Sequence, residues 1–201
     1  MAQAKTQPKL TFEEFLEYDD GTEKRYELVD GVPVEVPAES DLNLELAMAL
    51  MGLLLPFVGS LKLFRTKSQL AVSPLAGIPN QTREADLIVL TPELATVLKG
   101  EGSSVIRSKM PNPPLVVEFV SPYERPGDEN YQRDYLDKRK QYERRGIPEY
   151  WIVDATAQKV TVLTLKGKSY AEQVFTDQDR IVSAAFPALV LTAEQIFASD
   201  R

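Results

Sequence analysis

The sequence contains no cysteine and no histidine. The first absence excludes disulfides, thiolate zinc sites and thiol nucleophiles. The second removes the side chain that most often serves as a general base or a metal ligand. Any catalysis must therefore rely on carboxylates, Lys, Tyr, Ser or Thr. Any metal must be a hard cation with oxygen ligands, such as Mg²⁺ or Mn²⁺.

A long apolar segment is also lacking. The longest apolar run, 46–58, is too short to span a bilayer and contains Pro56, which favours a buried helix. The N-terminal segment MAQAKTQPKL has no apolar core of the kind that secretion signals carry. We therefore expect a cytoplasmic protein with no membrane partner. The chain has 201 residues, 43% of them hydrophobic and 26% charged, which predicts one globular domain over residues 1–201.

The charge of the chain is negative overall, with a formal net charge of −7. Such a balance opposes nucleic-acid binding on average, although local basic patches override the mean. The segment 131–145 holds six Lys and Arg residues against three Asp and Glu residues. A smaller basic group lies in KLFRTK, residues 62–67. These two segments are the candidates for phosphate contacts.

Local patterns near the N-terminus predict two helices and a hairpin. Residues 11–16 begin with the Thr-x-x-Glu pattern of a capping box, which predicts a short helix. RYELVDGVPVEV, residues 25–36, has two alternating halves around Asp-Gly and predicts a β-hairpin. Residues 40–55 predict a mostly apolar central helix, which we expect Pro56 to end.

The rest of the chain alternates between strands and helices. We expect strands at 67–72, 83–90, 115–120, 148–154 and 159–165, helices at 92–98, 131–145 and 191–197, and a loop at 73–80. Gly146 follows the charged helix at the position that a C-cap favours. This order predicts an α/β fold with a three-layer core, in which helices flank a mixed sheet.

Three of these elements carry an acid in an apolar setting. Glu27 interrupts YELV, Asp86 interrupts EADLIVL, and Glu118 stands in the middle of LVVEFV. A strand such as LVVEFV is expected to be buried on both faces, where an unpaired carboxylate costs several kcal/mol or changes its protonation state. Either another group holds this charge or the protein uses it.

The charged helix supplies a candidate partner for these acids. Helical spacing places one set of residues on a common side, so that Lys138 points where the tyrosines point. The set is Tyr131, Asp134, Lys138, Gln141 and Tyr142. If the tyrosines dock on the sheet, the Lys138 ammonium is delivered to the sheet as well.

A divalent cation is the usual way to neutralise clustered acids in a partly buried place. Asp86 and Glu118, from neighbouring strands, offer the all-oxygen ligands that Mg²⁺ requires, together with a nearby backbone carbonyl. Such an ion lowers the pKa of a bound water and stabilises charge on a phosphoryl oxygen. A nearby lysine can orient that water, so this chemistry needs neither His nor Cys.

Each of these residues also has a purely structural interpretation. Glu118 could be an edge-strand carboxylate that pairs with an Arg. Asp86 could pair with Arg83, and Glu27 with Arg25. Lys138 could be one solvated member of a basic helix. Trp151, Tyr150 and Ile152 look structural, and Asp154 is expected to terminate a strand.

Three segments in this order, ADLIVL (85–90), LVVEFVSP (115–122) and DYLDKRKQYERRGIPEYWIVD (134–154), resemble a known family. It is the bacterial putative restriction endonuclease family within the PD-(D/E)XK nuclease superfamily. The resemblance extends from RYELVDG to the FPALVLTAEQIF ending. Its most specific part is Lys138, Tyr142 and Gly146 at four-residue steps, followed by IPEYWIVD. The resemblance implies a restriction-endonuclease-like core.

Residue by residue, the resemblance implies that Asp86 is the motif aspartate, Glu118 the motif acid and Glu27 an auxiliary acid. The superfamily lysine normally stands two residues after the motif acid, where this chain has Val120. Lys138 on the following helix is then its stand-in.

The expected chemistry assigns a role to each of these groups. Asp86 and Glu118, with the Phe119 carbonyl, hold Mg²⁺ or Mn²⁺, and Lys138 positions or activates the attacking water. Glu27 supports a second cation or a metal-bound water. The residues expected to contact the substrate are Arg133, Arg139, Lys67, Gln69 and Tyr142.

The sequence therefore predicts a metal-dependent endonuclease that hydrolyses DNA phosphodiester bonds. A homodimer is expected by analogy with nucleases that pair two sites to cut two strands. An alternative is a nuclease-fold module weakened in catalysis and acting in nucleic-acid binding or assembly. The net charge supports it, as do Ala85, where relatives carry Pro, and Asn43, where many carry His. A third hypothesis keeps the metal and changes the substrate to RNA or a nucleotide.

Overall fold

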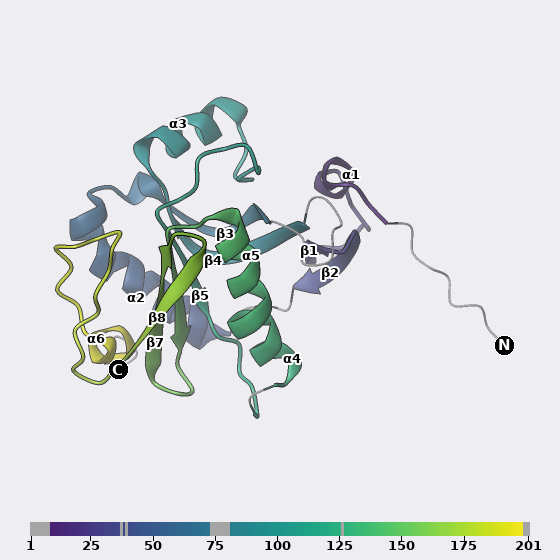
Figure 1. Ribbon diagram of the computed structural model, residues 1–201. Helices are drawn as coiled ribbons and strands as arrows, with labels where there is room; N and C mark the ends of the chain where they lie inside the picture. Colours follow the sequence, from purple (N-terminus) through teal and green to yellow (C-terminus); the bar gives the residue numbers. More distant parts are fainter. Residues whose placement is uncertain (1–8, 37, 39, 73–80, 126, 199–201) are drawn as a thin grey trace.

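A computed structural model describes residues 9–36, 38, 40–72, 81–125 and 127–198 (Figure 1). Its centre is a six-stranded sheet in the order β3-β4-β5-β6-β7-β8. Only the neighbours β5 and β6 are parallel, and every other pair in this sheet is antiparallel. The strands are β3 Phe64–Val72, β4 Gln81–Val89, β5 Leu115–Phe119, β6 Glu149–Asp154, β7 Lys159–Lys166 and β8 Ser169–Thr176.

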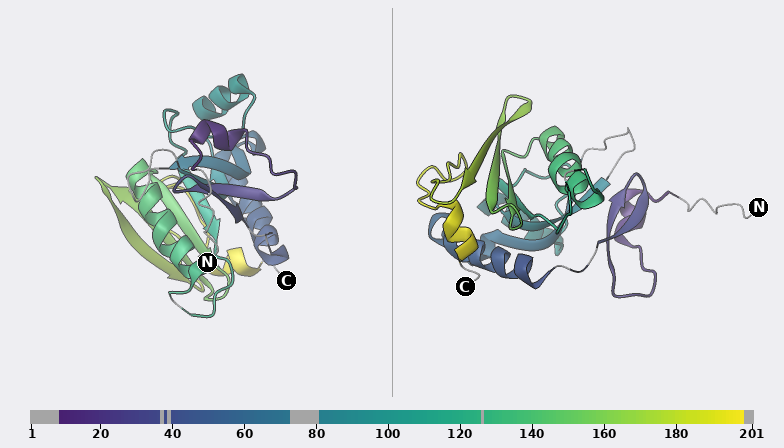
Figure 2. Two further views of the ribbon diagram at one scale, coloured as in Figure 1. Left: turned by 90° about the vertical axis from the view of Figure 1, so that its right-hand side faces the viewer. Right: turned by 90° about the horizontal axis from the view of Figure 1, so that it is seen from below.

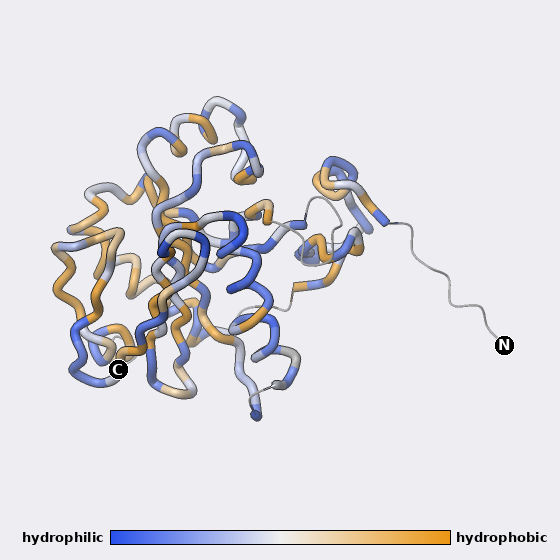
Figure 3. Tube along the Cα trace, viewed as in Figure 1, coloured by the Kyte–Doolittle hydropathy of each residue, from blue (hydrophilic) through white to orange (hydrophobic). Residues whose placement is uncertain are grey.

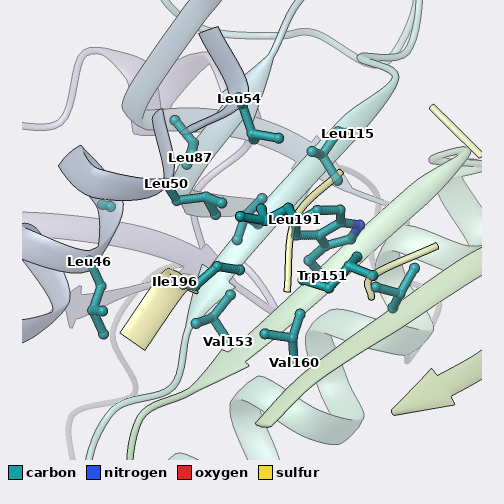
Figure 4. Packing of buried hydrophobic residues seen from close by; sticks show 14 of the residues in the cluster. Leu46, Leu50, Leu54, Leu87, Leu115, Trp151, Val153, Val160, Leu191 and Ile196 are labelled. Atoms are coloured by element: carbon teal, nitrogen blue, oxygen red, sulfur yellow. The ribbon is translucent and has the colours of Figure 1, made fainter. Parts of the chain in front are cut away.

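One face of the sheet is covered by α2 (Asp41–Val58) and α6 (Ala193–Phe197). Helix α2 places Leu46, Leu50 and Leu54 against the sheet, where they pack in one cluster with Trp151 (Figure 4). This helix has the length and mean hydropathy, 1.6, of a membrane span. One face of the helix, with Leu46, Leu50 and Leu54, nevertheless belongs to the core of the fold, whereas we expected the helix to be buried.

The end of α2 differs from the prediction. We expected Pro56 to stop the helix, but the helix continues to Val58 and ends at Gly59, which adopts a left-handed φ of 81°. A proline in the last turn removes one backbone donor, and the helix continues because the Gly59 N–H still bonds to the Leu55 carbonyl at 2.8 Å.

The opposite face is covered by α3 (Pro92–Glu101) and by a helical segment that runs from Glu129 to Arg145. This segment consists of α4 (Glu129–Tyr131), a π-helical stretch η2 (Gln132–Asp137) and α5 (Lys138–Arg145). The view from below in Figure 2 shows α5 and α2 on opposite sides of the strands. The predicted three-layer α/β architecture is confirmed.

The N-terminal elements form a separate unit beside this core. Helix α1 (Phe12–Leu16) carries the predicted capping box, and β1 (Arg25–Val29) pairs with β2 (Val32–Val36) in an antiparallel hairpin. The hairpin docks on β4, because the Leu28 N–H donates to the Thr82 hydroxyl at 2.9 Å. Glu27 is thereby carried from the hairpin to the central sheet.

Strand β8 was missed by the sequence analysis. Only Tyr170 and Phe175 of its eight residues are buried, so the strand lacks the alternating apolar pattern that reveals a half-buried strand. The short 3-10 helix η1 (Leu61–Leu63) was also not predicted. The predicted loop at 73–80 lies outside the described residues.

Candidate active site

Asp86 and Glu118 meet because β4 and β5 are antiparallel neighbours. Leu87 pairs with Val117, and the next positions in this register are Asp86 and Glu118. Side chains alternate along a strand, so both acids point to the face that carries Ile88 and the charged helix. The two acids are further linked by the Phe119 N–H, which donates to Asp86 Oδ2 at 2.8 Å.

Glu118 is fully buried, and both of its carboxylate oxygens have partners. Lys138 Nζ donates to Oε2 at 2.8 Å, and the Tyr142 hydroxyl donates to Oε1 at 2.5 Å. Burial raises the pKa of Glu118 to about 8, while the nearby Lys138 opposes the rise. The carboxylate in the middle of LVVEFV is therefore held by a lysine and a tyrosine, one helical turn apart on α5.

Lys138 connects Glu118 to a second acid on its own helix. Its Nζ lies 3.4 Å from Asp134 Oδ1, and Asp134 also accepts from Arg133 Nε at 2.9 Å. Burial lowers the pKa of Lys138, but Glu118 and Asp134 outweigh it and the net pKa is raised. The same cations hold the pKa of Asp134 below its usual value despite burial. In this metal-free arrangement, Lys138 is therefore an ammonium at neutral pH.

Asp86 is held by a different lysine. Lys67 Nζ, from β3, lies 2.5 Å from Asp86 Oδ1. The alternative pairing of Asp86 with Arg83 does not occur, because Arg83 is engaged elsewhere. Each of the two motif acids therefore has its own ammonium.

Glu27 reaches this region from the hairpin and is almost completely buried. Its Oε2 accepts from Arg83 Nη1 at 2.7 Å, and its Oε1 accepts from the Glu84 N–H at 2.8 Å. The expected alternative partner, Arg25, pairs with Glu84 instead. Glu27 thus fixes the Arg83 guanidinium, which also donates to the Gln141 side chain at 2.7 Å.

These groups surround a cavity of about 460 Å³. The charged residues that line it are Glu27, Glu35, Lys67, Arg83, Glu84, Asp86, Arg133, Asp134, Asp137 and Lys138. Phe119 and Ser121 also line it. Glu118 does not, since Lys138 and Tyr142 cover its carboxylate. The cavity thus contains both acids and cations, and the hairpin adds the apolar side chains of Val29, Val34 and Val36 to its lining.

Four predicted residues lie away from the cavity wall. Glu118 and Tyr142 lie buried behind it, bonded to each other. Gln69 turns toward the hairpin, where its Nε2 donates to the Tyr26 carbonyl at 2.9 Å. Arg139 points to β8 and pairs with Glu172 at 2.5 Å. The other predicted residues, Glu27, Lys67, Asp86, Phe119, Arg133 and Lys138, line the cavity.

Comparison with known proteins decides the family. Residues 12–194 match the model of the Uma2 family, described as "putative restriction endonuclease". The chain belongs to the Uma2 family. The resemblance inferred from the sequence motifs is confirmed. None of the curated proteins compared with this Uma2 chain matches it.

A solved structure has the same fold as this Uma2 protein. It is the crystal structure of a putative nuclease belonging to DUF820 from Anabaena variabilis ATCC 29413. The two chains are 17% identical and superpose with a TM-score of 0.65, covering 94% of this chain and 98% of the other. The family match supports a nuclease-type function, and the structural neighbour shows the fold.

The oxygen donors that line the cavity of this Uma2 protein are of the kind that bind a hard cation. Asp86 and Phe119 line the cavity, and a carboxylate and a carbonyl are ligands that Mg²⁺ and Mn²⁺ accept. Among the described residues, no three acids are gathered closely enough to hold a metal by themselves. A metal ion bound to Asp86 would displace Lys67 from Asp86 Oδ1. Glu118 could coordinate the same ion only if it gave up its hydrogen bond with Lys138 or the one with Tyr142.

Sequence reasoning gave no site role to several charged residues that line this cavity, among them Asp134 and Arg83. Asp134 was assigned to the same helix face as Lys138 but was given no role, although the i,i+4 spacing to Lys138 was a usable signal. Arg83 was considered only as a partner for Asp86, and its link to Glu27 and Gln141 depends on how the hairpin docks on β4.

Proposed function

We propose that this Uma2 protein is a Mg²⁺- or Mn²⁺-dependent endonuclease that hydrolyses phosphodiester bonds of DNA at the described cavity. The observation that carries the proposal is the convergence of Asp86, Glu118 and Lys138 from two neighbouring strands and the helix that covers them. The sequence predicted this convergence from three segments that are separated along the chain. Its location beside an acid-lined and cation-lined cavity supports a phosphoryl-transfer site.

In this proposal, Asp86, Glu118 and the Phe119 carbonyl hold the metal ion. The ion, when bound, activates a water molecule and stabilises charge on the phosphoryl oxygens. Asn43 contributes to the position of the Phe119 carbonyl, because its Nδ2 lies 3.4 Å from that oxygen. Glu27 acts indirectly by fixing Arg83 at the cavity wall.

Lys138 acts as a donor and a fixed positive charge. Glu118 and Asp134, the two acids beside its ammonium, raise the pKa of Lys138 in the metal-free chain. If a metal ion engaged Glu118, the Lys138 ammonium would remain beside Asp134 and could donate to the attacking water or to a phosphoryl oxygen. The proposal therefore refines the expectation that Lys138 positions or activates the water in favour of positioning.

Arg133 and Lys67 are proposed to bind the DNA backbone, since both line the cavity and carry positive charge. Arg133 is held in place by Asp134 and by the Ser121 hydroxyl, which accepts from its Nη2 at 2.8 Å. Such contacts give affinity that depends on salt and not on base sequence.

The experiment is cleavage of supercoiled plasmid and of labelled single-stranded DNA, duplex DNA and RNA, with Mg²⁺, Mn²⁺ or a chelator. The native chain is compared with Asp86→Asn, Lys138→Met and the control Lys168→Met, which removes one exposed charge outside the cavity. We expect metal-dependent DNA cleavage by the native chain and the control, with a loss of about 100-fold or more in the other two variants. Preferred cleavage of RNA would support the third hypothesis, in which the substrate is RNA or a nucleotide.

The alternative of a binding module has one observation in its favour. Each oxygen of Asp86 and Glu118 already has a protein partner, so the site is internally neutralised without a metal. Retained DNA binding without cleavage, and without detectable binding of Mn²⁺ at millimolar concentration, would favour this function over the nuclease.

We also propose that the protein is a homodimer, because α2 exposes an apolar stripe. Leu44 and Met48 are 50% and 59% exposed, and the half-buried Met51 and Leu55 continue the stripe at heptad spacing. Two copies of α2 packed antiparallel would bury these two stripes against each other.

Light scattering after size exclusion tests this assembly. We expect a dimer for the native chain and a monomer for Met48→Glu. Val174→Glu is the control, because Val174 is similarly exposed, at 49%, but lies on β8. A native monomer, or a dimer that survives Met48→Glu, would contradict the α2 interface.

A further inference from the structure

Lys67 has an unusual backbone conformation. Its φ is 50°, in the left-handed region that residues with a side chain rarely adopt. The other non-glycine residues with positive φ in the described part of the chain are Asp30, Gln158 and Asp177, and all lie in turns. Lys67 instead lies in the middle of the nine-residue strand β3. An unusual conformation that persists inside a strand points to a role at a site.

The conformation of Lys67 does not shift the pairing of its strand. Thr66 pairs with Leu87 and Ser68 pairs with Ala85, so the register is the same on both sides. Lys67 itself is left out of the ladder opposite Asp86. The local change is therefore confined to Lys67, whose ammonium meets Asp86 Oδ1 at 2.5 Å.

This contact occupies the side of Asp86 that a cation needs. The other oxygen, Oδ2, accepts from the Phe119 N–H. Lys67 and Asp86 both line the cavity, with side chains 26% and 12% exposed, so an ion entering from the cavity encounters this pair. Two cations cannot share one carboxylate oxygen at bonding distance without strong mutual repulsion.

We propose that Lys67 is a built-in counter-ion that occupies the cation position at Asp86 and is displaced when a divalent metal binds. The inference rests on the proposed function, because it requires the metal to bind at Asp86. Without a metal, Lys67 offsets the repulsion among the acids of the cavity, including Glu27 and Glu84. With a metal, the released ammonium is placed at the cavity wall, where it can contact a substrate phosphate.

Two consequences follow for the metal-free and metal-bound protein. Lys67 lowers the affinity for a divalent ion, because the ion must first break the Lys67–Asp86 pair. Lys67 also stabilises the metal-free fold, so its removal makes folding depend more strongly on the metal. A lysine that served only to bind DNA would produce neither effect.

The test measures Mn²⁺ binding by electron paramagnetic resonance, without nucleic acid, for the native chain, Lys67→Met and Lys62→Met. Both variants remove one lysine charge, but Lys62 does not line the cavity. We expect Lys67→Met to lower the Kd for Mn²⁺ about tenfold and Lys62→Met to leave it unchanged. The gain in Mn²⁺ affinity should vanish in the double variant Lys67→Met/Asp86→Asn.

Thermal unfolding supplies a second readout. In chelator, Lys67→Met should melt below Lys62→Met, and Mn²⁺ should raise its Tm more than that of the native chain. An unchanged or higher Kd in Lys67→Met overturns the inference. If the native chain still binds Mn²⁺ through Asp86 and cleaves DNA, the nuclease proposal survives that result. Absence of Mn²⁺ binding in every variant refutes both.

Discussion

The pH dependence of stability provides a direct test of the buried Glu118. Burial raises its pKa from 4.5 to about 8 in the folded chain. The folded state then binds more protons than the unfolded state between these two values. The contribution of Glu118 to the free energy of unfolding is therefore largest below pH 4.5 and falls as the pH rises toward 8. The slope is about 1.4 kcal/mol per pH unit where the folded group is protonated and the unfolded group is ionised.

The variant Glu118→Gln keeps the shape of the side chain and removes its titration. We expect the stability difference between the native chain and this variant to fall by about 2.5 kcal/mol between pH 5.5 and 7.5. The difference should then level off above pH 8. The assay is urea unfolding at matched ionic strength and one-unit pH intervals, with fluorescence of the single tryptophan, Trp151, as the probe. If the free energies of unfolding of the two proteins changed in parallel with pH, the reasoning would be refuted. Such a result would mean that Lys138 keeps Glu118 ionised over the whole pH range.

Three further predictions concern other parts of the chain. Glu149 is fully buried and accepts from Trp151 Nε1, the Ser183 hydroxyl and the backbone of Ala184 and Ala185. Glu149→Gln should therefore lower the free energy of unfolding by about 3 kcal/mol in urea titrations, and a loss under 1 kcal/mol would contradict this anchor. Gly146 has a φ of 82°, and an added Cβ meets only Asn112 at an ordinary 3.5 Å, so Gly146→Ala should cost about 1 kcal/mol by the same assay. In DNA-binding titrations, Arg133→Met should reduce the slope of log K against log salt by about 1, whereas Arg139→Met should not change it. Equal slopes for the two variants would show that DNA does not enter the cavity.

Most of the architecture was predictable because local patterns agreed with the fold. The Thr11 capping box, the Asp30-Gly31 turn and the Gly146 cap all depend on a few adjacent residues, and all three are present. Pro56 was misjudged because a single missing donor near a helix end is a weaker constraint than the packing of α2 on the sheet. Strand β8 was missed because an exposed edge strand with two buried residues lacks the apolar alternation on which the prediction depends.

The candidate site was predictable in part for a similar reason. An acid in an apolar strand is a strong local signal, and it identified Glu118 before any contact was known. The helix face that carries Lys138 and Tyr142 was visible from their spacing, and both side chains do reach Glu118. The positions of Gln69 and Arg139 were not predictable, because each turns toward a neighbour, the hairpin and β8, that lies far away along the chain.

The sequence by itself determined the chemistry available to this protein. Without His or Cys, the site had to be built from carboxylates, lysines and backbone oxygens, and the spacing of motifs determined which segments supply them. Only the tertiary structure decided which ammonium faces which acid. Lys67 and Lys138 are both basic residues near an acid, but the antiparallel register of β3 and β4 assigns Lys67 to Asp86, and the packing of α5 assigns Lys138 to Glu118. Such pairings depend on the distances between charges brought together from distant segments, which sequence spacing does not specify.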